Sequence, residues 1–517
     1  MSLKQFHFVS RFSFFTFYFL LFTSTIFSQN KNYQPPYFAD ANRVAKIKAM
    51  LPVLDELYKN YAVKNNIPGL AFGLVVDGKL IHQFNYGYSN IREKIPVTSQ
   101  SVFRIASMSK SFAAMAILQL RDAGKLQLDD AVSKYIPAMK QVKLLTADAP
   151  AITIRHLLTH GAGFPEDNPW GDRQLADTDD ELMQLLKNQL SFSTTPGTAY
   201  EYSNLGFALL GRIITVVSGK PYQQYIKEKI WLPLGMKQSE WEYANVPAKQ
   251  LAHGYRWIYG NWREEELLHD KANGSWGAMG GMLTSIADFA NYIALHANAW
   301  PPSNLPENTI LKRSSIREMH HPWRIRAFNP KAKCPSVAAY AYGLVYTKDC
   351  TNREWIGHSG GLPGFGSQWR FLPEYGIGIV AFANRTYAGF GDIHSAALDS
   401  LVQLAQLQPR ILPASDILEQ RKNELVALLP DWNNYATSNI LAENFRPDYP
   451  LDLLQKESKA IFEKAGKIIS VSKVNAENQL RGSFMLTCEK EKVEIYFTLS
   501  PEVPALVQEY RIQIIKP

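Results

Sequence analysis

The chain has 517 residues, of which 46% are hydrophobic and 20% are charged, with a formal net charge of +8 at pH 7. This composition is typical of a globular chain, and the length predicts two or three domains. Its lysines and arginines are scattered without a dense basic run, so nucleic acid is excluded as an expected partner.

Residues 1–28 have the pattern of a secretory signal peptide. Basic residues from Lys4 to Arg11 precede a strongly apolar run over residues 12–27, and Ser28 then offers a small residue for cleavage. An uncleaved anchor is the alternative, although the run is short for a membrane span. We therefore expect an exported protein, periplasmic or extracellular, with no stable membrane span after cleavage.

The first elements after the signal are a helix over 39–64 and two strands, 70–76 and 80–86, joined by the turn Asp77-Gly78. The later elements are expected in this order: a helix from Ser107 to Gly124, a short helix over 152–160, a helix over 205–217, a helix capped by Ser285, and strands over 341–347, 353–357, 366–372 and 376–383. The four late strands form an antiparallel meander, which is expected to join the first hairpin in one sheet with helices inserted between. The fold class is α+β.

A second, smaller α+β domain is expected at the C-terminal end. Residues 29–405 would form the main domain, and residues 406–415, which hold two prolines, would form a linker. Within residues 416–517 we expect two helices, 417–429 and 451–464, and four strands, 467–474, 481–488, 492–499 and 507–515. This domain shows no cluster of catalytic residue types, and its role is unknown.

The cysteines and histidines give little support to a metal site, so we expect no metal. Cys334 and Cys350 could close a small loop as a disulfide in an exported protein, or both could be reduced. The chain has three cysteines and no paired C-x-x-C spacing. His156 and His160 have the i, i+4 spacing of a metal pair, but no third ligand is evident, and packing or capping roles are favoured.

The pair Ser107 and Lys110 is the central candidate for chemistry. At a helix start, positions i and i+3 share one face, so the hydroxyl and the amine would point the same way. A serine hydroxyl is a weak nucleophile until a base takes its proton, and a desolvated lysine can help with that step. A second Ser-x-x-Lys pair, Ser470 and Lys473, lies in a predicted strand, where i and i+3 face opposite sides.

Two further motifs follow Ser107-x-x-Lys110 in the chain, Tyr202-Ser-Asn204 in a loop before a helix and His358-Ser359-Gly360 at the end of a strand. This combination resembles the serine β-lactamase and penicillin-binding-protein superfamily, and within it the class C β-lactamase-like family of carboxypeptidases, D-aminopeptidases and esterases. The resemblance covers roughly residues 40 to 400. It implies an antiparallel sheet flanked by helices with an all-helical insertion, and the C-terminal domain loosely resembles the cystatin-like appendages of some members.

The resemblance also implies a role for each motif residue, with no cofactor. Ser107 would attack an acyl carbonyl and form an acyl-enzyme, while Lys110 and Tyr202 would share the proton transfers. Because a phenol has a reference pKa near 10, Tyr202 is a poor base unless a cation such as Lys110 favours the phenolate. The other expected roles are a hydrogen bond between Asn204 and either Lys110 or a substrate amide, a cleft wall formed by His358, Ser359 and Gly360, and an oxyanion hole made by the N–H groups of Ser107 and Gly361.

One departure from the family pattern bears on the substrate. Class C β-lactamases carry lysine where this chain has His358, which resembles the peptidase-like members. Gly357-His-Ser359-Gly-Gly361 also fits the elbow of α/β-hydrolases, but a further strand is expected after it instead of the helix that an elbow requires. We therefore expect an exported serine hydrolase for small-molecule or short-peptide substrates, with cell-wall fragments as candidates; the alternative is a non-hydrolytic penicillin-binding or cell-wall-fragment sensor with the same pocket.

Overall fold

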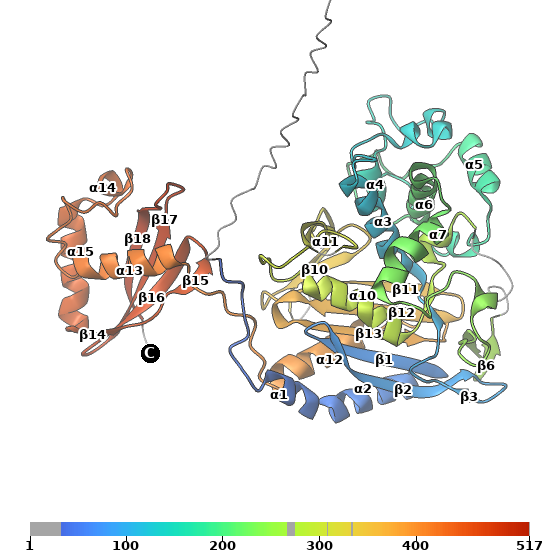
Figure 1. Cartoon of the computed structure of the whole chain (residues 1–517), viewed down its shortest axis with the longest axis horizontal. Helices are drawn as coiled ribbons and strands as arrows, with labels where there is room; N and C mark the ends of the chain where they lie inside the picture. Colours follow the sequence, from blue (N-terminus) through green and yellow to red (C-terminus); the bar gives the residue numbers. More distant parts are fainter. Residues whose placement is uncertain (1–32, 266–273, 308, 332–333, 516–517) are drawn as a thin grey trace, which may run out of the picture.

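The computed structural model describes residues 33–265, 274–307, 309–331 and 334–515 (Figure 1). The predicted signal peptide, residues 1–28, lies outside these ranges. Within them, none of the helices has the length and apolar character that crossing a bilayer would require.

A nine-stranded sheet in the order β3-β2-β1-β13-β12-β11-β10-β9-β8 forms the centre of the main domain. Its strands are β1 (Gly69–Val76), β2 (Lys79–Asn90), β3 (Ile95–Pro96), β8 (Arg324–Asn329), β9 (Ser336–Tyr340), β10 (Val345–Asp349), β11 (Glu354–Leu362), β12 (Phe365–Leu372) and β13 (Ile377–Ala383). β1 pairs antiparallel with β13, from Leu70 opposite Ala383 to Val76 opposite Ile377. The predicted sheet made from both ends of the domain is therefore confirmed.

Both faces of this sheet are covered by helices, because the buried side chains of the central strands alternate between two cores. Phe72 and Leu74 of β1 pack with α1 (Arg43–Ala49), α2 (Leu51–Lys64) and α12 (Gly391–Leu404). Ala71 and Val75 face the opposite core, which holds α3 (Lys110–Asp122) and α10 (Ile286–Asn298). Figure 1 shows the sheet between these two groups of helices.

The helix expected over 39–64 and the strand expected over 341–347 differ from the structure. The single helix expected over 39–64 is two helices that meet at Met50, because Pro52 in the first turn of α2 has no N–H to continue an α-helix. The strand expected over 341–347 is wrong in its first half, since β9 ends at Tyr340 and a turn precedes β10. Gly343 in this turn has a φ of +65°, and a Cβ there would lie 2.8 Å from the carbonyl oxygen of Lys110.

The segment between β3 and β8 contains most of the described α-helices. Besides α3 and α10 it contains α4 (Ile154–Leu158), α5 (Asp179–Lys187), α6 (Asn204–Ser218), α7 (Tyr222–Ile226), α8 (Leu232–Leu234), α9 (Gly277–Gly280) and α11 (Arg313–Met319). It also holds two short ribbons, β4 (Phe103–Arg104) with β7 (Leu283–Thr284), and β5 (Tyr255–Ile258) with β6 (Asn261–Glu264). The predicted cap of α10 is present, because Ser285 Oγ accepts from the N–H of Asp288.

The C-terminal α+β domain has a hydrophobic core of its own, which includes Trp432, Phe445 and Phe497. Its elements are α13 (Asp416–Leu428), α14 (Phe445–Asp448), α15 (Leu451–Ala465), β14 (Ile468–Val471), β15 (Asn475–Asn478), β16 (Arg481–Cys488), β17 (Lys492–Leu499) and β18 (Val507–Ile515), coloured orange to red in Figure 1. The sequence missed α14 and β15. Ile411, in the predicted linker, pairs with Tyr37 near the other end of the chain.

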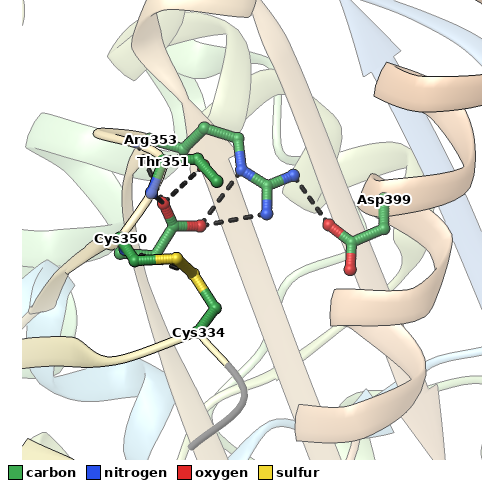
Figure 2. Close-up of a disulfide and its surroundings, with 6 residues drawn as sticks. Cys334, Cys350, Thr351, Arg353 and Asp399 are labelled. Carbon is green, nitrogen blue, oxygen red and sulfur yellow. Dashed lines mark hydrogen bonds and ion pairs between the residues drawn. A yellow bond between two sulfur atoms is a disulfide. The ribbon is translucent and has the colours of Figure 1, made fainter. Parts of the chain in front are cut away.

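Cys334 and Cys350 form a disulfide near the ends of β9 and β10 (Figure 2). Next to it, Arg353 donates to Asp349 and to Asp399 of α12. This network ties the β10–β11 turn to a helix on the sheet face. With 16 positions separating the cysteines, the crosslink is expected to contribute about 3 kcal/mol to the free energy of unfolding in the chain-entropy model.

Candidate active site

Ser107 lies in a 3-10 helix, η1 (Ala106–Ser109), and α3 begins only at Lys110. The sequence predicted one helix from Ser107, so the start of the regular helix is three residues later. Ala106 has a φ of +50°, a left-handed conformation that a residue with a Cβ adopts at a cost of about 1–2 kcal/mol. Ser107 is 8% exposed and lines the largest described cleft, so this turn presents its hydroxyl to solvent.

Lys110 is fully buried beneath Ser107 and is surrounded by oxygen atoms. Its Nζ donates to Asn204 Oδ1 at 2.6 Å and to the carbonyl oxygen of Met279 at 2.7 Å, and it lies 3.0 Å from Ser107 Oγ. Burial lowers the pKa of Lys110 to about 7, although the carboxylates of Asp167 and Asp172 oppose that shift. The amine can therefore lose its proton near neutral pH.

The three oxygen contacts can be met by both protonation states of this amine. The ammonium donates to Ser107, Asn204 and Met279. After it loses the proton directed at Ser107, two N–H bonds remain for Asn204 and Met279, and the lone pair is left for the Ser107 hydroxyl. A neutral lysine in this geometry can accept the hydroxyl proton during nucleophilic attack.

The hydroxyl of Tyr202 donates to Ser107 Oγ at 2.8 Å. Burial raises the pKa of Tyr202 well above its usual value near 10, so the phenol keeps its proton at neutral pH. The phenolate form considered for Tyr202 is therefore disfavoured by its surroundings, and the residue can act as a proton donor to Ser107 Oγ.

Asn204 is fully buried behind Lys110 and does not line the cleft. Its Oδ1 accepts from Lys110, and its Nδ2 donates to Asn168 Oδ1 at 2.6 Å. Of the two roles expected from the sequence, the structure has the bond to Lys110, and the substrate-binding role is not supported. Asp167 fixes this position by accepting from the backbone N–H of Asn204 at 2.6 Å and of Leu205 at 2.8 Å, at the start of α6.

The third motif lies inside β11, not at the end of a strand as expected. His358, Ser359 and Gly361 line the cleft opposite Ser107. β11 pairs with β10 only as far as Gly357, and from His358 onward its described pairing is with β12 alone. One backbone edge of the motif is therefore left open towards the cleft. Because β11 is followed by the strand β12 and not by a helix, the α/β-hydrolase elbow is excluded.

His358 is held by Tyr340 of β9. Its Nε2 lies 2.9 Å from the Tyr340 hydroxyl, and its Nδ1 lies 2.5 Å from the carbonyl oxygen of Ser359. Burial, with a further contribution from Lys110, lowers the pKa of His358 to about 3. The imidazole is therefore neutral, and both of its nitrogens are engaged, so His358 forms an uncharged part of the cleft wall.

Gly360 sets the distance between β11 and η1. A Cβ at this position would lie 2.2 Å from the carbonyl oxygen of Ile105, next to the turn that carries Ser107. Replacing Gly360 by alanine is therefore expected to push β11 away from Ser107 and to lower kcat/KM by about 10²-fold or more, the size of effect seen when a catalytic group is misplaced by about 1 Å. Gly389→Ala is the control, because a Cβ at Gly389 meets no atom within 4 Å. Equal kinetics in the two variants would contradict the proposed spacing role.

The histidines considered as a metal pair have structural partners. His156 Nδ1 accepts from the N–H of Thr153 in a capping box at the start of α4. His160 Nδ1 accepts from the N–H of Ser203, and its ring lies 4.3 Å from that of Tyr202. Among the residues that the structure describes, no group of three or more His, Cys, Asp or Glu side chains is arranged to hold a metal ion.

The cleft has a volume of about 730 Å³. Besides the predicted residues, it is lined by several that sequence reasoning missed, which are Glu166, Asn168, Pro169, Asp172, Tyr200, Glu201, Arg326, Tyr340, Val345 and Tyr387. These come from loops and strands far apart in the chain and form no motif. The only signal in the sequence was the position of Tyr200 and Glu201, which directly precede the second motif.

The chain is similar to known proteins in sequence and in fold. A family model described as Beta-lactamase matches residues 54–403. Protein flp from Staphylococcus aureus (strain MW2) is 29% identical over 335 residues, 64% of this chain and 62% of that protein. Beta-lactamase-like protein 2 from Dictyostelium discoideum is 30% identical over 361 residues, 68% of this chain and 62% of that protein. The matched part is thus less than two thirds of the length of either relative.

Two solved structures share the fold. The octameric penicillin-binding protein homologue from Pyrococcus abyssi has a TM-score of 0.57 and 22% identity, with 90% of this chain and 96% of that chain covered. The penicillin binding protein from Bacillus halodurans has a TM-score of 0.53 and 25% identity, with 67% of this chain and 98% of that chain covered.

Proposed function

The chain belongs to the beta-lactamase family, and from that premise we propose that it is an exported serine hydrolase that acts on small peptide, amide or ester substrates through an acyl-enzyme on Ser107. The observation that carries the proposal is the position of Ser107 Oγ, 3.0 Å from Lys110 Nζ and 2.8 Å from the Tyr202 hydroxyl, in the wall of a cleft. A nucleophile, a base and a proton donor thus meet at one atom.

The proposed reaction has two steps. Ser107 Oγ attacks the substrate carbonyl carbon while its proton passes to the neutral Lys110, and the tetrahedral intermediate then expels an amine or alcohol, which takes up a proton from Lys110 or Tyr202. In the second step Lys110 is neutral again, after passing its proton to the leaving group or to Tyr202. Water attacks the resulting ester and gives a proton to Lys110, which returns it to Ser107 Oγ as the acid is released. The backbone N–H groups of Ser107 and Gly361 are the proposed donors to the oxyanion.

His358 supports a peptidase-like or esterase-like activity over a dedicated β-lactamase. With its pKa lowered to about 3, the imidazole carries no positive charge at neutral pH, whereas a lysine at this position would. An anionic antibiotic would therefore lack that cationic partner on β11. Cell-wall fragments are candidate natural substrates, and slow turnover of a penicillin is compatible with the proposal.

Labelling of the nucleophile tests the proposed function. The purified protein is treated with a fluorophosphonate and, separately, with a labelled penicillin, and the adduct is mapped by mass spectrometry. We expect an adduct on Ser107, with the peptide that contains Ser470 of the second Ser-x-x-Lys pair unlabelled as an internal control. An adduct on any other residue, or none, would refute it.

The fate of the acyl group separates a hydrolase from a sensor with the same pocket. Steady turnover of a D-aminoacyl amide, a D-Ala-D-Ala peptide, a cephalosporin or a short-chain ester is expected for the hydrolase. A penicillin adduct that persists on Ser107, without turnover of any of these compounds, would show a binding protein instead.

A further inference from the structure

Asp172 is a buried carboxylate that lines the cleft and takes no part in the acylation chemistry described above. Asp172 is only 2% exposed, yet it is one of the residues that line the cleft. Oδ2 accepts a hydrogen bond of 2.9 Å from the Tyr387 hydroxyl, and within the described part of the chain no donor is seen for Oδ1. Asp172 Oδ1 is not among the buried side-chain atoms that lack a partner, so it reaches the open space of the cleft, where a ligand can donate to it.

The pair of Asp172 and Tyr387 connects the two walls of the cleft. Asp172 lies in a 3-10 helix, η4 (Gly171–Arg173), which packs on the catalytic side chains, since a Cβ at Gly171 would lie 2.9 Å from Cβ of Asn204. Tyr387 follows β13 and packs on the third motif, since a Cβ at Gly361 would lie 2.8 Å from Cδ1 of Tyr387. The carboxylate is therefore next to the reacting centre.

The charge of Lys110 acts on Asp172, but the hydrogen bonds of Lys110 Nζ go to Asn204, Met279 and Ser107, so the carboxylate remains open to a positively charged ligand. Although the whole chain has a net charge of +8, the cleft is lined by three carboxylates and a single arginine, Arg326. Arg326 lies near Tyr200, with its Cζ 6.0 Å from the centre of that ring, and among the described residues no bond from it to Asp172 is seen. Arg173, which follows Asp172, is exposed and is not among the residues that line the cleft.

We infer that Asp172 and Tyr387 form a subsite for a primary ammonium group of the substrate. The inference rests on the proposed function and narrows it to amides and esters that carry a free amine close to the scissile carbonyl. An ammonium group has three N–H donors, which fit the unused oxygen of Asp172 and the lone pair of Tyr387, whose own proton is given to Asp172. One carboxylate and one phenol supply too few oxygens for a divalent metal ion.

Protection of Ser107 from a fluorophosphonate tests this subsite. The competitors are the amides of glycine, L-alanine and D-alanine, each compared with its N-acetyl derivative, which has the same shape at the carbonyl but no charge on nitrogen. We expect at least one free amine to protect Ser107 about tenfold better or more than its acetylated form, the effect of one hydrogen bond between charged groups. Where both the free amine and its N-acetyl derivative are hydrolysed, we expect kcat/KM for the free amine to be higher by the same factor.

Two variants assign the preference to the subsite. Asp172→Asn keeps the shape and removes the charge, so the ratio between free and acetylated competitors should fall to about one. Tyr387→Phe keeps the carboxylate and should give an intermediate ratio. Asp180→Asn, which changes an exposed carboxylate on α5, is the control and should leave the ratio unchanged.

The outcomes separate this inference from the proposed function. If Ser107 is labelled but free and acetylated competitors protect it equally, or none protects it, the subsite is refuted while the proposed function stands. A preference that survives Asp172→Asn also refutes it. If Ser107 is not labelled at all, the proposed function fails first. The competition on the unmodified protein remains decisive should either variant fail to fold.

Discussion

Replacement of Ser107 by alanine is expected to lower kcat/KM by about 10⁴-fold or more for every substrate that the protein turns over. The change removes the hydroxyl oxygen to which Lys110 and Tyr202 both bond, at 3.0 and 2.8 Å. Without Oγ no acyl-enzyme can form, and the oxyanion donors alone act on water as the nucleophile. The measurement is steady-state hydrolysis of the best substrate in the panel above.

Ser470→Ala is the matched control for this variant. Ser470 has the same Ser-x-x-Lys spacing to Lys473, but it lies in β14 of the C-terminal domain, and Lys473 lies beyond the end of that strand. Both residues are exposed, so this pair is not the buried dyad that Ser107 and Lys110 form. Its kinetics should equal those of the unmodified protein. Turnover by Ser107→Ala within a few-fold of that level would mean that another residue, such as Ser359 in the same cleft, is the nucleophile.

The main sheet could be predicted from sequence because its signals are local. The Asp77-Gly78 turn has φ values of +50° and +74°, which fits the tight hairpin that these two residue types favour. The meander of β10 to β13 likewise follows from alternating segments separated by turns. Once the meander and the hairpin are each recognised, the pairing of β1 with β13 is the remaining step, and burial of both faces requires it.

The environment of the catalytic pair could not be predicted, because it is made by residues distant in sequence. The spacing of Ser107 and Lys110 indicated a shared face, yet it could not show that the carbonyl of Met279 in α9 accepts from the amine. That contact depends on packing between α3, α9 and η1. The pKa of Lys110, and hence its suitability as a base, follows from this packing and not from the motif.

Sequence reasoning was also limited where one residue changes the local path of the chain. Pro52 divides the first helix, and Gly343 ends the strand expected over 341–347. The contact of Asp172 with Tyr387 joins residues 215 positions apart, and neither belongs to a motif. Functional residues of this kind become visible only when the two walls of the cleft are placed together.

Lys110 is expected to control the pH dependence of acylation. Because burial lowers its pKa to about 7, the reactive neutral amine increases as pH rises, and kcat/KM should rise with pH to a plateau with a midpoint of about 7. The neighbouring groups do not titrate there, since the pKa of His358 is lowered to about 3 and the pKa of Tyr202 is raised well above 10. If the phenolate of Tyr202 were the base, the rise would lie well above pH 10.

Lys110→Met tests the same assignment, because methionine has a similar length and no basic nitrogen. We expect kcat/KM to fall by about 10²–10⁴-fold, the contribution of a general base, and the rise near pH 7 to disappear. Lys134→Met is the control, since the Lys134 side chain is 58% exposed and pairs with Asp130 outside the cleft. A profile that keeps its midpoint in Lys110→Met would assign the titration to another group. A midpoint near 10 in the unmodified protein would mean that burial does not lower the pKa of this amine, and the proton would then need a different acceptor.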